Sequence, residues 1–193
     1  MNKCISKEEL NELPIQGFEG NTVVIEYACD VQKIIPVLKN QSTLGFDTET
    51  RPTFKKGRKN TVALLQLSTP DTAFVIRLNK MGLPNEIIDI LADPNILKAG
   101  VAIKDDIIGL RELSDFKPGG FVELQEKVKE FKIENFGLKK LSGLLLGFRI
   151  SKAQQTSNWE AEELTPAQIK YAATDAWVSL EIYNRLMEIE KAS

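Results

Sequence analysis

The chain has 193 residues, of which 42% are hydrophobic and 27% are charged, a composition typical of one globular domain with a sizeable apolar core. Its formal net charge of -2 argues against a protein whose main task is tight nonspecific binding of a polyanion, but not against an enzyme with a local basic patch and metal ions. The absence of histidine excludes a Ser-His-Asp triad, a Cys-His pair, histidine acid–base catalysis and histidine-ligated zinc.

Cysteine content and hydropathy bear on the location of the protein. Cys4 and Cys29 are too few for a disulfide framework and are expected to be reduced thiols. The sequence has no uninterrupted apolar run of 18 residues, and neither a secretory signal nor a membrane span is indicated. We therefore expect no membrane association and a cytoplasmic location by default.

The N-terminal third begins with a short helix and a strand. Ser6 and Glu9 have the spacing of a capping box, and Pro14 ends the helix that they begin. A β-branched run predicts a strand over 22–27, and a helix follows over about 30–38, where Pro36 is poorly tolerated. We expect residues 1–21 to be an N-terminal segment that packs on a domain formed by residues 22–193.

Two carboxylates end the next strand, which is expected over 44–49. Asp47 and Glu49 are separated by one residue, so an extended strand places both on the same face. Close carboxylates repel each other and lose solvation, and a divalent cation supplies the missing positive charge. The alternative is an ordinary strand that runs into a polar loop.

A basic loop follows this acid pair. It contains four cations around a glycine: Lys55, Lys56, Arg58 and Lys59. Such a run can be a solvated turn, or it can place positive charge beside a phosphate backbone.

The middle of the chain predicts an α/β fold. Strands over 62–68 and 73–78 form a hairpin and, with the strand over 44–49, an antiparallel meander. A helix from Pro84 to about 92, a strand over 96–103 and helical periodicity over 107–113 follow. This alternation indicates a sheet that begins with the meander and continues through crossovers, flanked by helices.

A second acidic feature lies where the strand over 96–103 meets the following helix. Ligands of open α/β sheets collect at the carboxyl ends of strands, where Asp105 and Asp106 are expected. One aspartate can cap the helix while the other binds a ligand. Alternatively, both aspartates only cap and solubilise the helix.

Two further helices are expected over about 121–131 and 138–146, the second bounded by glycines at 137 and 147. The segment over 151–163 has no clear periodicity. It is either a binding loop that uses Trp159 or a connector anchored by that tryptophan in the core.

The last helix has a capping box of Thr165 and Gln168 and is expected to end at about 189. Within it, Tyr171 and Asp175 are four residues apart and share a face, with alanines around them. Alone, this pair could be a buried hydrogen bond. Together with the acids at the strand ends, it could complete an all-oxygen site for two divalent ions that hold a phosphodiester.

Three ordered motifs resemble those of the DEDD-type 3'-5' exonucleases, in the branch with a tyrosine in the third motif, which includes ribonuclease D and the exonuclease domain of the Werner syndrome protein. Phe46-Asp47-Thr48-Glu49 resembles the first motif of that family. The segment over 100–106 resembles the second motif, and the segment over 171–176 resembles the third. The resemblance covers roughly residues 22–190.

The resemblance implies a ribonuclease H-like mixed sheet, an antiparallel meander plus parallel strands, and a metal-dependent exonuclease domain over 22–193. The implied ligands of two Mg²⁺ or Mn²⁺ ions are Asp47, Glu49, Asp106 and Asp175. Tyr171 would orient the attacking water, because an unperturbed phenol is a poor base. We also predict that substrate is contacted by Thr48, by the basic loop with Lys55, Lys56, Arg58 and Lys59, and by Trp159 if its segment is a binding loop.

The implied reaction is hydrolysis of the terminal phosphodiester at the 3' end of DNA or RNA, which releases nucleoside 5'-monophosphates. A helicase or another nucleic-acid-processing protein could act as partner. The competing interpretations are a catalytically inactive nucleic-acid-binding or scaffold module of the same fold, and a metal phosphatase that acts on small phosphoesters.

Overall fold

A computed structural model describes residues 3–53 and 60–192. The described strands form one mixed sheet in the order β1-β4-β3-β2-β5-β6. These strands are β1 (Asn21–Ile25), β2 (Thr43–Thr50), β3 (Val62–Ser68), β4 (Thr72–Arg77), β5 (Leu97–Gly100) and β6 (Phe121–Glu123). The helices are α1 (Lys7–Glu12), α2 (Ala28–Lys39), α3 (Leu78–Met81), α4 (Asn85–Ala92), α5 (Lys104–Leu113), α6 (Leu124–Glu130), α7 (Leu138–Leu146) and α8 (Pro166–Lys191).

The sheet combines a meander with parallel strands, as expected from the sequence. Strands β2, β3 and β4 pair antiparallel, whereas β1 pairs parallel with β4, β5 with β2, and β6 with β5. Every residue of β3 is buried, because this central strand is covered on both faces.

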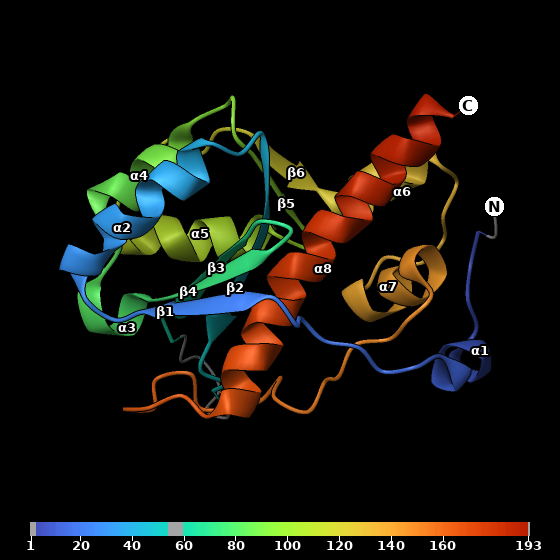
Figure 1. The fold of residues 1–193 in the computed structure, drawn as a ribbon, viewed down its shortest axis with the longest axis horizontal. Helices are drawn as coiled ribbons and strands as arrows, with labels where there is room; N and C mark the ends of the chain where they lie inside the picture. The colour runs from blue at the N-terminus through green and yellow to red at the C-terminus, as the bar shows by residue number, and fades with distance from the viewer. Residues whose placement is uncertain (1–2, 54–59, 193) are drawn as a thin grey trace.

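Helices cover both faces of the sheet (Figure 1). On one face, α2 and α4 pack on the apolar side chains that alternate along the strands, such as Phe46 and Leu65. On the other face the long α8 crosses the strands, with α7 beside it. The alternation of side chains along β2 therefore directs Phe46 toward α2 and α4, and its neighbours Gly45 and Asp47 toward α8.

Close packing of α8 on β2 depends on small residues. A Cβ atom added to Gly45 would lie 1.9 Å from the carbonyl oxygen of Ala176, so the backbones approach where no side chain intervenes. Ala172 and Ala173 on the same helix are also fully buried. This contact brings the middle of α8 next to the end of β2 where the acid pair lies.

Two expectations for the segments beside the site are wrong. The segment that was expected to begin a helix at 121 first forms the parallel edge strand β6, and α6 begins only at Leu124. The strand expected over 96–103 ends at Gly100, because Ala102 adopts a left-handed backbone with φ of 61° and turns the chain into α5. In α2, by contrast, the helix continues through Pro36, which lies on its exposed side near the C-terminal end.

The N-terminal segment lies against α7. Leu10 of α1 is buried, and a Cβ atom added to Gly143 of α7 would lie 2.4 Å from its side chain. Farther along, Ile15 forms a parallel bridge with Arg149, whose Nε donates to the carbonyl oxygen of Leu13 at 2.9 Å.

None of the helices in the described part of the chain is both long enough and apolar enough to cross a bilayer.

Candidate active site

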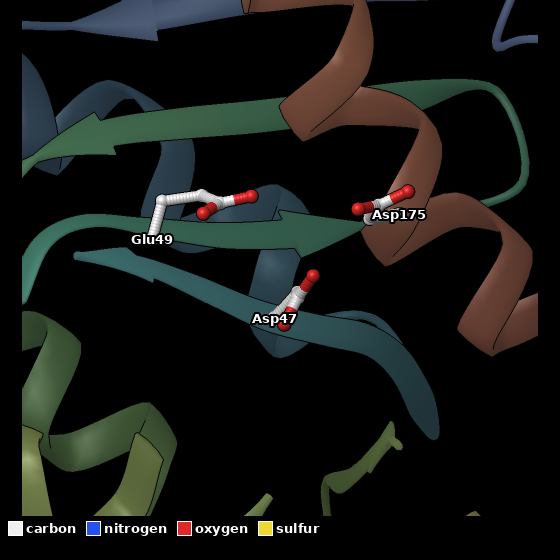
Figure 2. Close-up of side chains that lie close together, drawn as sticks. All are labelled: Asp47, Glu49 and Asp175. Atoms are coloured by element: carbon white, nitrogen blue, oxygen red, sulfur yellow. The ribbon is translucent and has the colours of Figure 1, made fainter. Parts of the chain in front are cut away.

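Three carboxylates from two distant parts of the sequence converge at one end of β2. Asp47 and Glu49 project from β2, and Asp175 projects toward them from α8 (Figure 2). One oxygen of each carboxylate lies within 4.8 Å of one oxygen of the other two. The alternation along β2 and the close approach of α8 at Gly45 together produce this arrangement.

The electrostatics of this cluster are unfavourable without a cation. Burial, and then repulsion from Asp175 and Glu49, raise the pKa of Asp47 well above its usual range. Burial and repulsion from Asp175 and Asp106 raise the pKa of Glu49 to about 9. Burial also raises the pKa of Asp175. A divalent ion would remove both causes, because it replaces lost solvation and cancels the repulsion.

One oxygen of the cluster is in place for a ligand. The Oδ1 atom of Asp175 is buried and accepts no hydrogen bond from any residue that the structure describes. Buried carboxylate oxygens rarely stay without a partner. The hard oxygen donors of Asp47, Glu49 and Asp175 match the preference of Mg²⁺ and Mn²⁺, so these residues fit a divalent metal.

Tyr171 lies one turn before Asp175 on α8 and lines the same cleft. A hydrogen bond with Tyr171 lowers the pKa of Asp175, against the larger effect of burial. Burial and the neighbouring carboxylates Asp175 and Glu49 raise the pKa of Tyr171, so its phenol remains protonated at neutral pH.

Trp159 does not face this cleft, which corrects its expected role in substrate binding. Its side chain is completely buried, and its ring centroid lies 5.9 Å from that of Tyr171. A ring without exposed surface cannot stack on a base. Trp159 therefore anchors the segment over 151–163 and supports Tyr171 from behind, in agreement with the alternative interpretation of this segment.

Asp106 lies beside the three carboxylates but not among them. Its Oδ1 accepts a hydrogen bond from the hydroxyl of Thr48, which projects from β2 on the face opposite to Asp47 and Glu49. Asp106 nevertheless raises the pKa values of Asp47 and Glu49. The expected convergence of four acids is thus seen for three, with the fourth linked to β2 through Thr48.

Asp105 does not cap α5, contrary to expectation. The N-cap position is Ile103, and Asp105 is exposed in the first turn. The carboxylate of Glu123, at the end of β6, instead accepts hydrogen bonds from the backbone amides of Ala102 and Ile103, at 2.9 and 2.8 Å, and from that of Gln125. Glu123 was missed because its segment was interpreted as helix. Its signal is an acid that directly follows two apolar strand residues.

The cleft around the acids has a volume of about 230 Å³ and includes two lysines, one of which, Lys152, belongs to the segment over 151–163 that was a candidate binding loop. Lys139 comes from α7, and Lys152 from the segment after it. The positive charge of Lys152 lowers the pKa of Asp175. The expected basic contacts Lys55, Lys56, Arg58 and Lys59 lie outside the described residues.

Sequence comparisons identify relatives over almost the whole chain. The model of a family described as 3'-5' exonuclease matches residues 23–190. The mouse bifunctional 3'-5' exonuclease/ATP-dependent helicase WRN is 33% identical over 195 residues, which cover 95% of this chain and 14% of the mouse protein. Human exonuclease 3'-5' domain-containing protein 2 is 29% identical over 185 residues, which cover 88% of this chain and 30% of the human protein. This chain thus spans less than a third of either relative.

Solved structures agree with the fold. The Nibbler EXO domain of Aedes aegypti superposes with a TM-score of 0.81 at 24% identity and covers 92% of this chain and 93% of its own. RNase D of Escherichia coli superposes with a TM-score of 0.78 at 22% identity, covering 89% of this chain and 46% of its own. These similarities confirm the expected ribonuclease H-like mixed sheet flanked by helices. The family assignment itself rests on the sequence matches: because the family model covers residues 23–190 and the mouse relative is 33% identical over 95% of this chain, the chain belongs to the 3'-5' exonuclease family of hydrolytic nucleases.

Proposed function

We propose that this chain is a metal-dependent 3'-5' exonuclease that hydrolyses the terminal phosphodiester of DNA or RNA and releases nucleoside 5'-monophosphates. The observation that carries the proposal is the convergence of Asp47, Glu49 and Asp175, whose oxygens lie within 4.8 Å of one another in an open cleft. A purely structural cluster of this kind would destabilise the fold without compensation.

Asp47, Glu49 and Asp175 would hold the metal ions, and Asp106 would contribute from its position beside Thr48. Two Mg²⁺ or Mn²⁺ ions, when bound, supply activation of the attacking water and stabilisation of the leaving oxygen. The carboxylates of this chain supply the negative charge that binds and orients such ions. They must be ionised to do so, and their raised pKa values oppose ionisation until the ions bind.

Tyr171 would position the attacking water. Its raised pKa leaves the hydroxyl protonated, so the phenol can direct a water by hydrogen bonding but is unsuited to remove a proton. The buried ring of Trp159 packs against the ring of Tyr171 and fixes its position.

The experiment that tests this proposal uses a 5'-labelled oligonucleotide incubated with the purified protein and Mg²⁺ or Mn²⁺. We expect a ladder that shortens from the 3' end by single nucleotides, requires the metal and disappears in Asp47→Ala. An intact substrate with both metals would contradict the proposal and favour an inactive module of the same fold. Hydrolysis of free nucleotides but not of polymers would indicate a phosphatase.

We also propose that a helicase acts together with this exonuclease as a functional partner. The mouse relative is named as both exonuclease and ATP-dependent helicase, and this chain matches 14% of its length. A helicase, on the same or another polypeptide, would supply the single-stranded 3' ends that the cleft receives.

A further inference from the structure

A groove with three lysines adjoins the acid cleft. It has a volume of about 570 Å³ and is lined by Phe136, Lys139, Lys140 and Lys152, together with Glu134 and Asn135. We call it the lysine groove. Lys139 and Lys152 line both this groove and the acid cleft, so the two cavities adjoin at these lysines.

The lysines of this groove form no close ion pair. Lys139, Lys140 and Lys152 have no carboxylate within 4.0 Å in the described ranges 3–53 and 60–192, in contrast to Lys80 and Lys127. Lys152 acts on the carboxylate of Asp175 only at longer range. Glu134 is the one acid among the groove's lining residues, so the groove is net positive. Three unpaired cations beside a cluster of acids suit a polyanion that reaches the acids through metal ions.

Phe136 adds a contact that is independent of charge. Its side chain is 38% exposed although it is large and apolar, and it lies among the lysines just before α7, with the ammonium of Lys129 over one face of the ring at 5.8 Å from the centroid. An exposed aromatic ring next to a basic groove is the arrangement on which the bases of a single strand stack.

Among the residues that the structure describes, two other cavities adjoin the acid cleft, and the described lining of both suits a strand of phosphates less well. The cavity beyond Tyr171 is mostly apolar, and its Lys170 is paired with Glu19. The cavity beyond Thr48 contains three acids, and its Arg51 is paired with Glu160. Those acids are Asp105, Asp106 and Glu112.

A cut at the 3'-terminal phosphodiester leaves one nucleotide on one side of the acids and the rest of the strand on the other. The longer, more highly charged part requires the cationic path. We propose that the phosphates on the 5' side of the cleaved bond lie along the lysine groove, with Lys139 and Lys140 contacting successive phosphates and Phe136 stacking on a base. This inference rests on the proposed function and adds the path of a single-stranded substrate.

The test measures binding without cleavage. A 5'-fluorescein-labelled single strand, as DNA and as RNA of the same sequence, is titrated with wild-type protein and with K139Q/K140Q in chelator, and anisotropy is followed over a range of salt concentrations. The control is K33Q/K39Q, which removes the same charge from α2 on the opposite side of the sheet, from the exposed Lys39 and from Lys33, which is paired with Asp30. Circular dichroism verifies that each variant is folded.

We expect K139Q/K140Q to raise Kd by roughly fivefold or more at low salt and to lower the slope of log K against log salt by about 1.4, because each phosphate contact on a single strand contributes about 0.7. The control should leave both values unchanged. Phe136→Ala should raise Kd without changing the slope, because stacking releases no counterions.

Equal Kd and slope in K139Q/K140Q and in the control would overturn the inference, as would a wild-type protein that does not bind the strand. The two proposals fail separately. If binding depends on the lysines but no metal-dependent ladder forms, the groove still binds the strand and the proposed exonuclease activity is wrong. If a ladder forms but binding does not depend on the lysines, the exonuclease activity is supported and the proposed path along the lysine groove is wrong.

Discussion

Glu49 illustrates the cost of keeping acids together in the absence of a cation. It is a half-buried carboxylate whose pKa is raised to about 9 by burial and by Asp175 and Asp106. Glu49→Gln removes the charge while keeping nearly the same shape. In chelator at pH 8, we therefore expect this variant to be more stable than wild type, by about 1–3 kcal/mol, measured by urea denaturation.

With Mn²⁺ present, the order should reverse, because the variant loses a ligand and with it most of the stabilisation by the metal. Glu181→Gln is the control. Glu181 is also a partly buried acid with a raised pKa, but it lies outside the acid cluster and should leave the metal effect intact. A Glu49→Gln protein that is less stable than wild type in chelator would contradict this account of the cluster.

Tyr171 can be tested separately from metal binding. Tyr171→Phe removes only the hydroxyl, and the ring keeps its contact with Trp159. If the hydroxyl positions the attacking water, kcat should fall by roughly 10- to 100-fold, the value of one to two well-placed hydrogen bonds. The affinity for Mn²⁺, measured by calorimetry, should change little. A loss of activity that is fully restored by more metal would instead make Tyr171 a determinant of metal affinity.

Periodicity and capping residues predict the long elements well, because their signals are local. The capping box of Thr165 and Gln168 marks the start of α8, and the glycines at 137 and 147 bound α7 as expected. The short strand β6 was missed because three residues carry too little alternation, and it exists only through pairing with β5. The turn at Ala102 is likewise stabilised by Glu123, which lies 21 residues away in the sequence.

In the candidate site, too, local sequence patterns predict some features, whereas others depend on tertiary packing. Asp47 and Glu49 share a face of β2 by strand alternation alone, and Tyr171 and Asp175 share a face of α8 by helical spacing. Their convergence depends on packing at Gly45, which no local pattern encodes. The position of Asp106 behind Thr48 and the continuity of Lys139 and Lys152 with the cleft are also properties of tertiary structure.

The segment over 151–163, which carries Trp159, is held to the sheet by a buried arginine. Arg77 at the end of β4 is fully buried, pairs with Glu26 at 2.8 Å and donates to the carbonyl oxygens of Ala161 and Glu162. Arg77→Met should lower the free energy of unfolding by about 3 kcal/mol, because these partners lose their donor in a buried setting.

The same variant should also loosen the segment, so that limited proteolysis cuts within 151–163 before the sheet unfolds. The control is Lys80→Met, which removes the more exposed partner of Glu26 and an ion pair with the exposed side chain of Glu162, but none of the buried contacts of Arg77. It should cost less than about 1 kcal/mol and leave the segment protected. Equal losses in both variants would show that the buried contacts of Arg77 are not what holds the segment.

Across the protein, the acid cluster should determine how stability depends on pH. A carboxylate whose pKa is raised by folding contributes stability below its unfolded pKa and loses that contribution as pH rises through its folded pKa. For Glu49 this window runs from 4.5 to about 9. In chelator, the melting temperature should therefore fall as pH rises through this window.

Mg²⁺ or Mn²⁺ should remove much of this decline, because ions compete with protons for the same oxygens and bind better as pH rises. Thermal melts at a series of pH values, with chelator and with metal, measure both effects. Glu49→Gln should flatten the curve in chelator. A metal effect that is larger at pH 5 than at pH 8 would contradict ligation by these carboxylates.

The central claim is that Asp47, Glu49 and Asp175 together bind a divalent metal ion. Anomalous diffraction from crystals grown with Mn²⁺ tests this claim most directly. We expect strong anomalous density in contact with oxygens of all three carboxylates, and its loss in crystals of Asp175→Asn. Well-ordered crystals with saturating Mn²⁺ and no anomalous density between these carboxylates would contradict the account.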